Sequence, residues 1–201
     1  MITFDNYNGT PTNLLPQQGV ALYYGTLFAI EQATRFYNIL EKKIPWENDV
    51  VHMFGKRIVT QRKVAWFGDK AYPYKYSNTT KVALPWTKEL LEIKHKVEDA
   101  SHEKYNSCLL NYYHEGIEGM GWHSDNEKEL KPNGAIASVS FGATRKFSFK
   151  HRETRETKSV LLEHGSLLVM KGEVQSHWLH SLPKTKKVTT GRINLTFRTI
   201  A

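Results

Sequence analysis

The sequence predicts a mostly β domain of the α+β type, a double-stranded β-helix or jelly roll with helices packed outside it. After Asn106 the chain consists of short runs rich in β-branched and aromatic residues, separated by Gly, Pro, Asn and His-Gly breaks. No helical pattern intervenes, so we expect these runs to pair as antiparallel strands of two facing sheets. The expected strands span residues 106–113, 135–141, 144–150, 158–163, 165–170 and 190–199.

The N-terminal half is expected to supply the helices. Residues 1–17, rich in Asn, Pro, Thr and Gly, indicate an irregular lead-in before a short apolar strand at 20–24. Apolar residues recur near helical spacing from about 26 to 43. They do so again from about 85 to 100, where a proline suits the first turn. These two helices can cover one side of a sheet.

A region of different character separates the two expected helices. Residues 50–67 and 72–78 are basic and aromatic, and they predict an additional hairpin region at about 50–80 in which specificity could reside. A chain of 201 residues is long enough for one domain with a substantial core and too short for two full ones. We therefore expect a single domain over 1–201.

Charge and cysteine content limit the partner and the compartment. Lys and Arg number 28 against 20 for Asp and Glu, a net charge of +8, which favours a polyanionic partner such as nucleic acid. The single cysteine, Cys108, lies in an apolar run, so a buried thiol in a reducing compartment is expected rather than a disulfide framework. No leader or membrane span is visible. We expect an intracellular protein, cytoplasmic in a bacterium and nuclear in a eukaryote, without membrane association.

A candidate metal site begins at His123 and Asp125. On an extended strand, residues two apart point to the same face, so both side chains could reach one ion. The third ligand must come from a distant segment, and the candidates in order are His180, His177 and His164. Two histidines and one carboxylate suit a half-open Fe(II) site, although hydrolytic zinc sites use the same donors. By itself, a His-x-Asp motif also fits an ordinary surface loop.

A polar row near the C-terminus suggests a co-substrate. Alternate residues place two arginines on one face of a strand and apolar side chains on the other. Burying guanidinium groups is costly unless carboxylates meet them, so a dicarboxylate such as 2-oxoglutarate would explain the row. The alternative is a strand whose polar face lies in solvent. The polar row comprises Arg192, Asn194, Thr196 and Arg198, and the apolar row Ile193, Leu195 and Phe197.

Together these motifs resemble the AlkB family of Fe(II)- and 2-oxoglutarate-dependent nucleic-acid dealkylases, from about residue 50 to the end. Five motifs carry the resemblance, and they occur in family order. They are Asn111-Tyr112-Tyr113, Gly121-Trp122-His123-Ser124-Asp125, Ala137-Ser138-Val139-Ser140-Phe141-Gly142, His180-Ser181-Leu182-Pro183 and Arg192-x-Asn194-x-Thr196-x-Arg198.

The resemblance assigns roles to matching positions. It implies that His123, Asp125 and His180 bind Fe(II), with 2-oxoglutarate and O2 as co-substrates. It further implies that 2-oxoglutarate is held by Asn111, Tyr113, Arg192, Asn194 and Arg198. Arg192 and Tyr113 are expected at the distal carboxylate, and Arg198 is expected near the end that chelates iron.

The region around 53–77 resembles the branch that acts on duplex DNA. By matching position, Phe54 would fill the gap left by a flipped base, and Tyr74 and Tyr76 would line the base pocket. From the residues alone, Phe54 would be assigned to the core. Asn126 stands where close relatives carry a second acid, with Glu127 as the nearby substitute. The full expected substrate-binding set is Phe54, Lys56, Arg62, Tyr74, Tyr76, Ser77, Trp122 and Glu127.

The implied function is oxidative demethylation of 1-methyladenine and 3-methylcytosine in DNA, with RNA as a further substrate. Formaldehyde is released while 2-oxoglutarate and O2 are consumed to succinate and CO2. Duplex DNA is the expected partner of a monomer, with single strands as an alternative. Basic clusters at 56–63, 150–158 and 184–187 would contact phosphate. Two other functions stay open: a 2-oxoglutarate oxygenase of a protein or small molecule, and a non-catalytic nucleic-acid-binding jelly roll.

Overall fold

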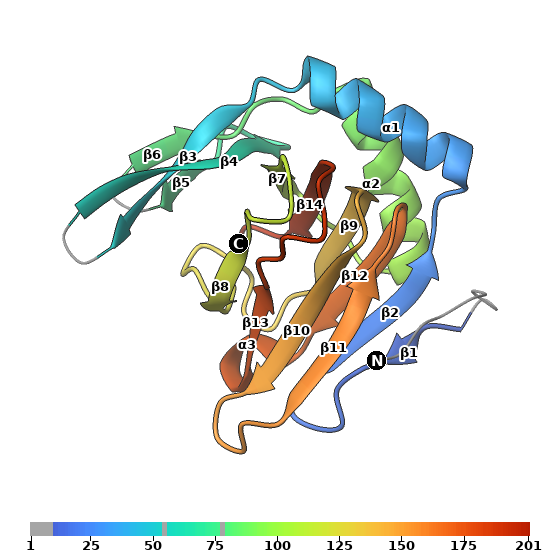
Figure 1. Ribbon diagram of the computed structural model, residues 1–201, viewed down its shortest axis with the longest axis vertical. Helices are drawn as coiled ribbons and strands as arrows, with labels where there is room; N and C mark the ends of the chain where they lie inside the picture. The colour runs from blue at the N-terminus through green and yellow to red at the C-terminus, as the bar shows by residue number, and fades with distance from the viewer. Residues whose placement is uncertain (1–9, 54–55, 77–78) are drawn as a thin grey trace.

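Two antiparallel sheets face each other in the computed structural model, which describes residues 10–53, 56–76 and 79–201 (Figure 1). The large sheet has the strand order β1-β2-β12-β9-β14-β7-β4-β3 and the small sheet β11-β10-β13-β8, with β5 and β6 forming a separate pair. The mostly β jelly roll predicted from the sequence is confirmed. The strands are β1 (Thr12–Asn13), β2 (Val20–Thr26), β3 (Glu47–Met53), β4 (Lys56–Gly68), β5 (Pro73–Tyr76), β6 (Thr79–Val82), β7 (Ser107–Tyr113), β8 (Met120–His123), β9 (Ile136–Gly142), β10 (Arg145–His151), β11 (Thr157–Leu162), β12 (Ser166–Lys171), β13 (Trp178–Leu182) and β14 (Arg192–Arg198).

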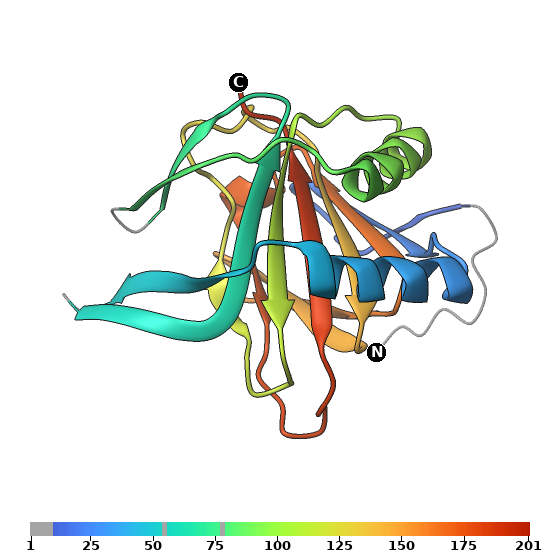
Figure 2. The same ribbon diagram turned by 90° about the horizontal axis from the view of Figure 1, so that it is seen from above.

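The large sheet has a buried core on each face. On one face, the apolar row of β14 packs with side chains of α1 (Ile30–Lys43) and α2 (Lys88–Ser101), including Phe36 and Ile93. On the other face, side chains such as Tyr113 and Met170 meet Phe149 of the small sheet. The helices therefore cover the outside of the large sheet, as expected, and the small sheet lies on its other face (Figure 2).

Helix α1 begins at Ile30, about four residues later than the sequence pattern predicts. Thr26 still belongs to β2 and pairs with Ser166. The backbone N–H groups of the next two residues both donate to the carbonyl of Gly165. Phe28 then enters the core, with its ring centroid 5.4 Å from that of Phe141. Sheet pairing and aromatic packing thus use the residues that helical spacing alone assigned to the first turn.

Helix α2 also begins later than predicted. Its first residue is Lys88, and the hydroxyl oxygen of Thr87 accepts a hydrogen bond from the backbone N–H of Leu90. A side-chain acceptor at this position satisfies one of the free N–H groups of the first turn. Pro85 therefore lies before the helix rather than inside its first turn.

The region expected to form one additional hairpin contains two. Strand β4 pairs with β7 at one end and with β3 at the other, so it extends the large sheet and carries a hairpin beyond it (Figure 2). Strands β5 and β6 form the second hairpin. The predicted lead-in at 1–17 contains a short strand, β1, which pairs with β2, while residues 1–9 lie outside the described residues. No helix within the described ranges is long and apolar enough to cross a membrane.

Candidate active site

A cavity of about 260 Å³ lies between the two sheets, and it brings together side chains from distant parts of the chain. The large sheet contributes residues from β4, β7 and β14, and the small sheet contributes residues from β8 and β13. All eight residues expected to bind metal or 2-oxoglutarate line this cavity: Asn111, Tyr113, His123, Asp125, His180, Arg192, Asn194 and Arg198.

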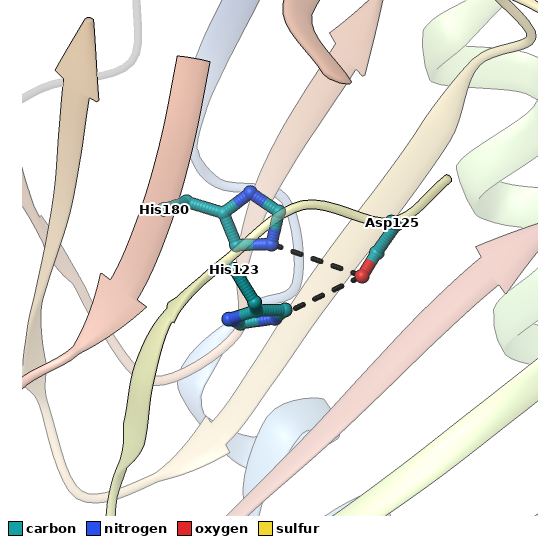
Figure 3. A group of neighbouring side chains, drawn as sticks. All are labelled: His123, Asp125 and His180. Carbon is teal, nitrogen blue, oxygen red and sulfur yellow. Dashed lines mark ion pairs between the residues drawn. The ribbon is translucent and has the colours of Figure 1, made fainter. Parts of the chain in front are cut away.

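His123, Asp125 and His180, which all line the cavity, lie side by side (Figure 3). Their donor atoms lie within 4.8 Å of one another, so the three side chains could hold one metal ion. Asp125 Oδ1 is 3.8 Å from Nε2 of each histidine. β8 ends at His123, so Asp125 reaches the group from the following loop rather than from the strand that the sequence spacing suggested.

The structure also distinguishes the three histidines considered for the third position. His180 lies in the middle of β13, where its backbone pairs with that of His123. His177 belongs to the short helix α3 (Val174–His177), and its ring stacks on His151. The Nδ1 of His164 accepts a hydrogen bond from the backbone N–H of Gly142. Only His180 of these three lies beside His123 and Asp125.

The electrostatic surroundings favour the protonation states that a metal requires. Burial would raise the pKa of Asp125, but the attraction of Arg198 and the two histidines outweighs it and holds the pKa below its usual value. Burial lowers the pKa of His180 to about 4. A deprotonated carboxylate and a neutral imidazole are the metal-binding forms. Nδ1 of His123 lies 2.8 Å from the carbonyl of Gly121 and can donate to it, which leaves Nε2 free to face a metal.

The polar row of β14 lines the cavity and is buried. Its four side chains are between 2% and 8% exposed, which excludes the alternative of a polar face in solvent. Arg192 Nη2 donates to Ser140 Oγ at 2.9 Å and to Asn194 Oδ1 at 2.7 Å. At the other end of the row, Arg198 Nη2 donates to Asp125 Oδ2 at 2.7 Å. The row therefore connects directly to the metal-binding group.

Arg192 is the residue of the row best suited to bind a carboxylate ligand. Burial lowers the pKa of its guanidinium to about 10, which leaves it charged at neutral pH. Its Nε has no hydrogen-bond partner, and it makes no salt bridge with any carboxylate of the described residues. A buried cation in this state is costly unless an anion meets it. The donor set at the metal end and this unpaired donor fit Fe(II) and 2-oxoglutarate in one cavity.

Arg62 lies in a different environment from the one expected. Its side chain is 6% exposed, forms an ion pair with Asp49 and donates from Nη1 to the sulfur of Met120 at 3.2 Å. Its guanidinium carbon is 5.9 Å from the ring centroid of Tyr113. Arg62 therefore lines the cavity rather than the outer surface on which it would contact phosphate, and the expected basic cluster at 56–63 is reduced by one charge.

Trp122 and Glu127 differ in their relation to the cavity. Trp122, expected to bind substrate, does not line the cavity and is 42% exposed. Lys150 Nζ lies 4.3 Å from the ring centroid of Trp122. Glu127 does line the cavity, with Oε1 3.9 Å from Nη1 of Arg198.

Other expected substrate residues fall where little or nothing is described. Phe54 and Ser77 lie outside the described residues. Lys56 begins β4, and Tyr74 and Tyr76 belong to β5, but only their backbone is described. Their expected contacts with a flipped base stay predictions.

Two residues of the site were not anticipated. Asp49 pairs with Arg62 across the β3–β4 hairpin, at a place where the strand register shifts. Gln175 of α3 accepts a hydrogen bond at Oε1 from the backbone N–H of Asp125, at 2.8 Å. An acid opposite an arginine in a hairpin is a recognisable signal, but the irregular register hides it. Nothing in the sequence indicates the contact of Gln175.

Comparison with known proteins identifies the class to which this fold and site belong. The family model described as the 2OG-Fe(II) oxygenase superfamily matches residues 19–198. The chain belongs to that superfamily and, on the similarity of its relatives, to the AlkB family within it. The dependence on Fe(II), 2-oxoglutarate and O2 expected from the sequence is thereby confirmed.

Particular relatives narrow the position within the family. The chain is 36% identical over 197 residues to DNA oxidative demethylase ALKBH2 of Mus musculus, covering 92% of this chain and 82% of that protein. It is 38% identical over 194 residues to the protein of the same name from Homo sapiens, covering 91% and 74%. It is 34% identical over 191 residues to alpha-ketoglutarate-dependent dioxygenase alkB homolog 3 of Mus musculus, covering 90% and 66%.

A solved structure supports the fold. The structure titled "The structure of OsALKBH1" superposes with a TM-score of 0.61 at 17% sequence identity, covering 92% of this chain and 98% of that one. At this level of identity the likeness concerns the fold alone. The resemblance to the ALKBH2 branch predicted from the sequence motifs rests on the sequence relatives, and they confirm it.

Proposed function

We propose that this protein is a DNA oxidative demethylase that removes N-methyl groups from bases such as 1-methyladenine and 3-methylcytosine. The observation that carries the proposal is the single cavity in which His123, Asp125 and His180 face a buried arginine row. Relatives named DNA oxidative demethylase, at 36% and 38% identity, support DNA as the substrate. The single domain, 1–201, acts as a monomer in this proposal.

The proposed ligand assignments follow the geometry of the cavity. His123, Asp125 and His180 would bind Fe(II), which supplies the oxidising chemistry when it is bound. Arg192, with Asn111, Asn194 and Tyr113 beside it, would hold the distal carboxylate of 2-oxoglutarate. Arg198, which already contacts Asp125, would lie near the end of the co-substrate that reaches the metal.

The proposed reaction inserts one oxygen atom of O2 into a C–H bond of the N-methyl group. The other oxygen atom enters succinate as 2-oxoglutarate loses CO2. The N-hydroxymethyl product then loses formaldehyde, which breaks the C–N bond and restores the base without cutting the strand. The residues of the cavity orient the two substrates and keep water away from the reacting methyl group.

A methylated base must leave the stack before it can enter the cavity. Unstacking costs a few kcal/mol, and less for a base that already cannot pair. Phe54 would occupy the vacated place, while Tyr74, Tyr76 and Ser77 would contact the flipped base. Lys56 and the clusters at 150–158 and 184–187 would contact phosphate. Arg62 and Glu127 would contact the substrate from within the cavity that they line.

The direct test is a repair assay. The anaerobically purified protein is given ferrous iron, 2-oxoglutarate, O2 and an oligonucleotide that contains 3-methylcytosine, as a single strand and as a duplex. Succinate and repaired base are expected to form together, and Asp125→Ala is expected to form neither. Phe54→Ala should lower repair of the duplex more than repair of the single strand.

The outcomes separate the alternatives. Succinate formation without base repair would favour an oxygenase of a protein or small molecule. Binding of the oligonucleotide with neither product would favour a non-catalytic jelly roll. If Phe54→Ala lowers repair of the duplex and of the single strand equally, the preference for duplex DNA is wrong, whereas the demethylase activity itself is still supported.

A further inference from the structure

The loop that carries Asp125 borders two cavities. A second cavity, of about 280 Å³, is lined by residues 125–128 of this loop together with residues 130–136. Asp125 and Arg198 line both cavities, and Gln175 and Ser176 of α3 line the second one. Close packing normally fixes the position of a buried side chain. At Asp125 that support is reduced, so polar contacts must hold the residue in place.

Two hydrogen bonds hold Asp125 from different directions. The carboxylate is held by Arg198, whose Nη2 donates to Oδ2 at 2.7 Å. The backbone is held by Gln175, whose Oε1 accepts from the N–H of Asp125 at 2.8 Å. With Oδ2 engaged, the other oxygen, Oδ1, faces the two imidazoles at 3.8 Å from each (Figure 3).

Gln175 is well placed to couple the two halves of the metal-binding group. It lies in α3, which leads directly into β13 and therefore to His180. Its Nε2 lies 3.9 Å from the sulfur of Met170, on the neighbouring strand β12. The side chain thus connects the loop after β8 to the segment that supplies the second histidine. Loss of this connection would remove the hydrogen bond that holds the Asp125 backbone beside the second cavity.

We propose that Gln175 is a positioning residue for the metal centre, holding the backbone of Asp125 so that Oδ1 faces the two histidines. The inference rests on the proposed role of Asp125 as a metal ligand. Groups that orient metal ligands, without touching the metal, typically contribute 10- to 100-fold to metal affinity. A loss of about that size is expected when Gln175 cannot accept the hydrogen bond.

The test measures metal binding without catalysis. Co(II) is titrated anaerobically into the metal-free protein, and its visible absorption bands report both the dissociation constant and the ligand geometry. Gln175→Leu removes the acceptor at similar volume and should raise the dissociation constant about 10- to 100-fold and alter the bands. Gln175→Glu keeps an oxygen acceptor and should recover most of the affinity. Ser176→Ala, an exposed neighbour on α3, should stay within about twofold of the parent.

The dissociation constants of the Gln175 and Asp125 variants for Co(II) distinguish the possible outcomes. A Gln175→Leu protein with the parental dissociation constant and bands would overturn it, and so would an equal loss in Gln175→Glu. Should Gln175→Leu fail to fold, Gln175→Asn retains the amide on a shorter side chain and must show the same loss. Asp125→Ala separates this inference from the proposed site. If Asp125→Ala binds Co(II) as the parent does, the metal site itself is wrong rather than the role of Gln175.

Discussion

Replacing Arg192 with methionine tests the co-substrate assignment through a buried charge. Arg192 is 2% exposed, its Nε has no partner among the residues that the structure describes, and its pKa is lowered to about 10 because it is buried. Truncating one member of a buried charge pair costs about 2–5 kcal/mol, which is about 30-fold to a few thousand-fold in affinity. Arg192→Met should therefore bind 2-oxoglutarate at least about 30-fold more weakly.

The assay is the stabilisation of Mn(II)-loaded protein by 2-oxoglutarate, measured by thermal or urea unfolding. At 100 times the parental dissociation constant, the parent gains about 2.7 kcal/mol, whereas a variant binding 30-fold more weakly gains only about 0.9 kcal/mol. Without 2-oxoglutarate the variant should be about as stable as the parent. Exchanging a buried charge for an apolar side chain is often neutral. In addition, Asn194 Oδ1 keeps the hydrogen bond from Ser138 Oγ.

Arg145→Met is the matched control. Arg145 is equally buried but does not line the cavity. Its Nη2 donates to the carbonyls of Gly116, Glu118 and Pro183, so its loss removes three buried hydrogen bonds, although the Gly116 carbonyl still accepts from the Thr185 N–H. This variant should lose stability and keep the parental affinity for 2-oxoglutarate. The reasoning is refuted if Arg192→Met retains the full stabilisation by 2-oxoglutarate.

Three further predictions concern the surface, the pH dependence and the backbone. Trp122→Ala should weaken oligonucleotide binding, measured by fluorescence anisotropy, because the Trp122 ring is exposed and stacking of a base on such a ring contributes about 1–3 kcal/mol. An unchanged affinity would show that no base stacks on Trp122. Burial would raise the pKa of Glu98, but hydrogen bonds from Lys94 and the Tyr105 N–H outweigh burial and lower this pKa from its usual value of 4.5. The ionised Glu98 therefore stabilises the fold above pH 4.5, and this stabilisation is lost as the pH falls through the lowered pKa of the folded protein. Glu98→Gln should therefore reduce the free energy of unfolding by about 1–3 kcal/mol at pH 7, with the difference from the parent disappearing in acid; a constant difference would contradict this. Gly142 has φ +87°, and a Cβ there would meet the carbonyl oxygen of Gly191, the residue just before its register partner Arg192. Gly142→Ala should therefore cost about 2 kcal/mol or more in urea unfolding, and a parental midpoint would show that the strand can move.

The parts of the site that the sequence predicted are those where side chains alternate regularly along one strand. In β14, alternation alone separates the polar row from the apolar row, and the structure buries the two rows on opposite faces. The choice of His180 over His177 also followed from spacing. The choice agrees with the structure for a partly different reason: His180 lies in the middle of β13, whereas His177 belongs to the preceding helix α3 rather than to the opposite face of the same strand.

The parts that the sequence did not predict depend on contacts between distant segments. Helical spacing cannot show that Phe28 is needed in the core, since its partner Phe141 is far away in the chain. Arg62 was expected at the surface because it lies in a basic run, yet the fold turns it inward to Asp49. The role of Gln175 also depends on a contact between distant segments. Its contact with Asp125 depends on how a four-residue helix meets a loop fifty residues earlier.

Arg198 gives the site a thermodynamic property that neither half has alone. It ends the co-substrate row and holds Asp125 Oδ2, so any rearrangement of its side chain acts on both. A coupling between two binding sites is reciprocal: the factor by which metal changes the affinity for 2-oxoglutarate equals the factor by which 2-oxoglutarate changes the affinity for metal. Arg198→Lys keeps the charge but loses the planar fork, so it should weaken both affinities and reduce both factors equally. Titration of Mn(II) with and without 2-oxoglutarate measures this coupling. A coupling factor in Arg198→Lys equal to that of the parent would show that the two ligands communicate by another route.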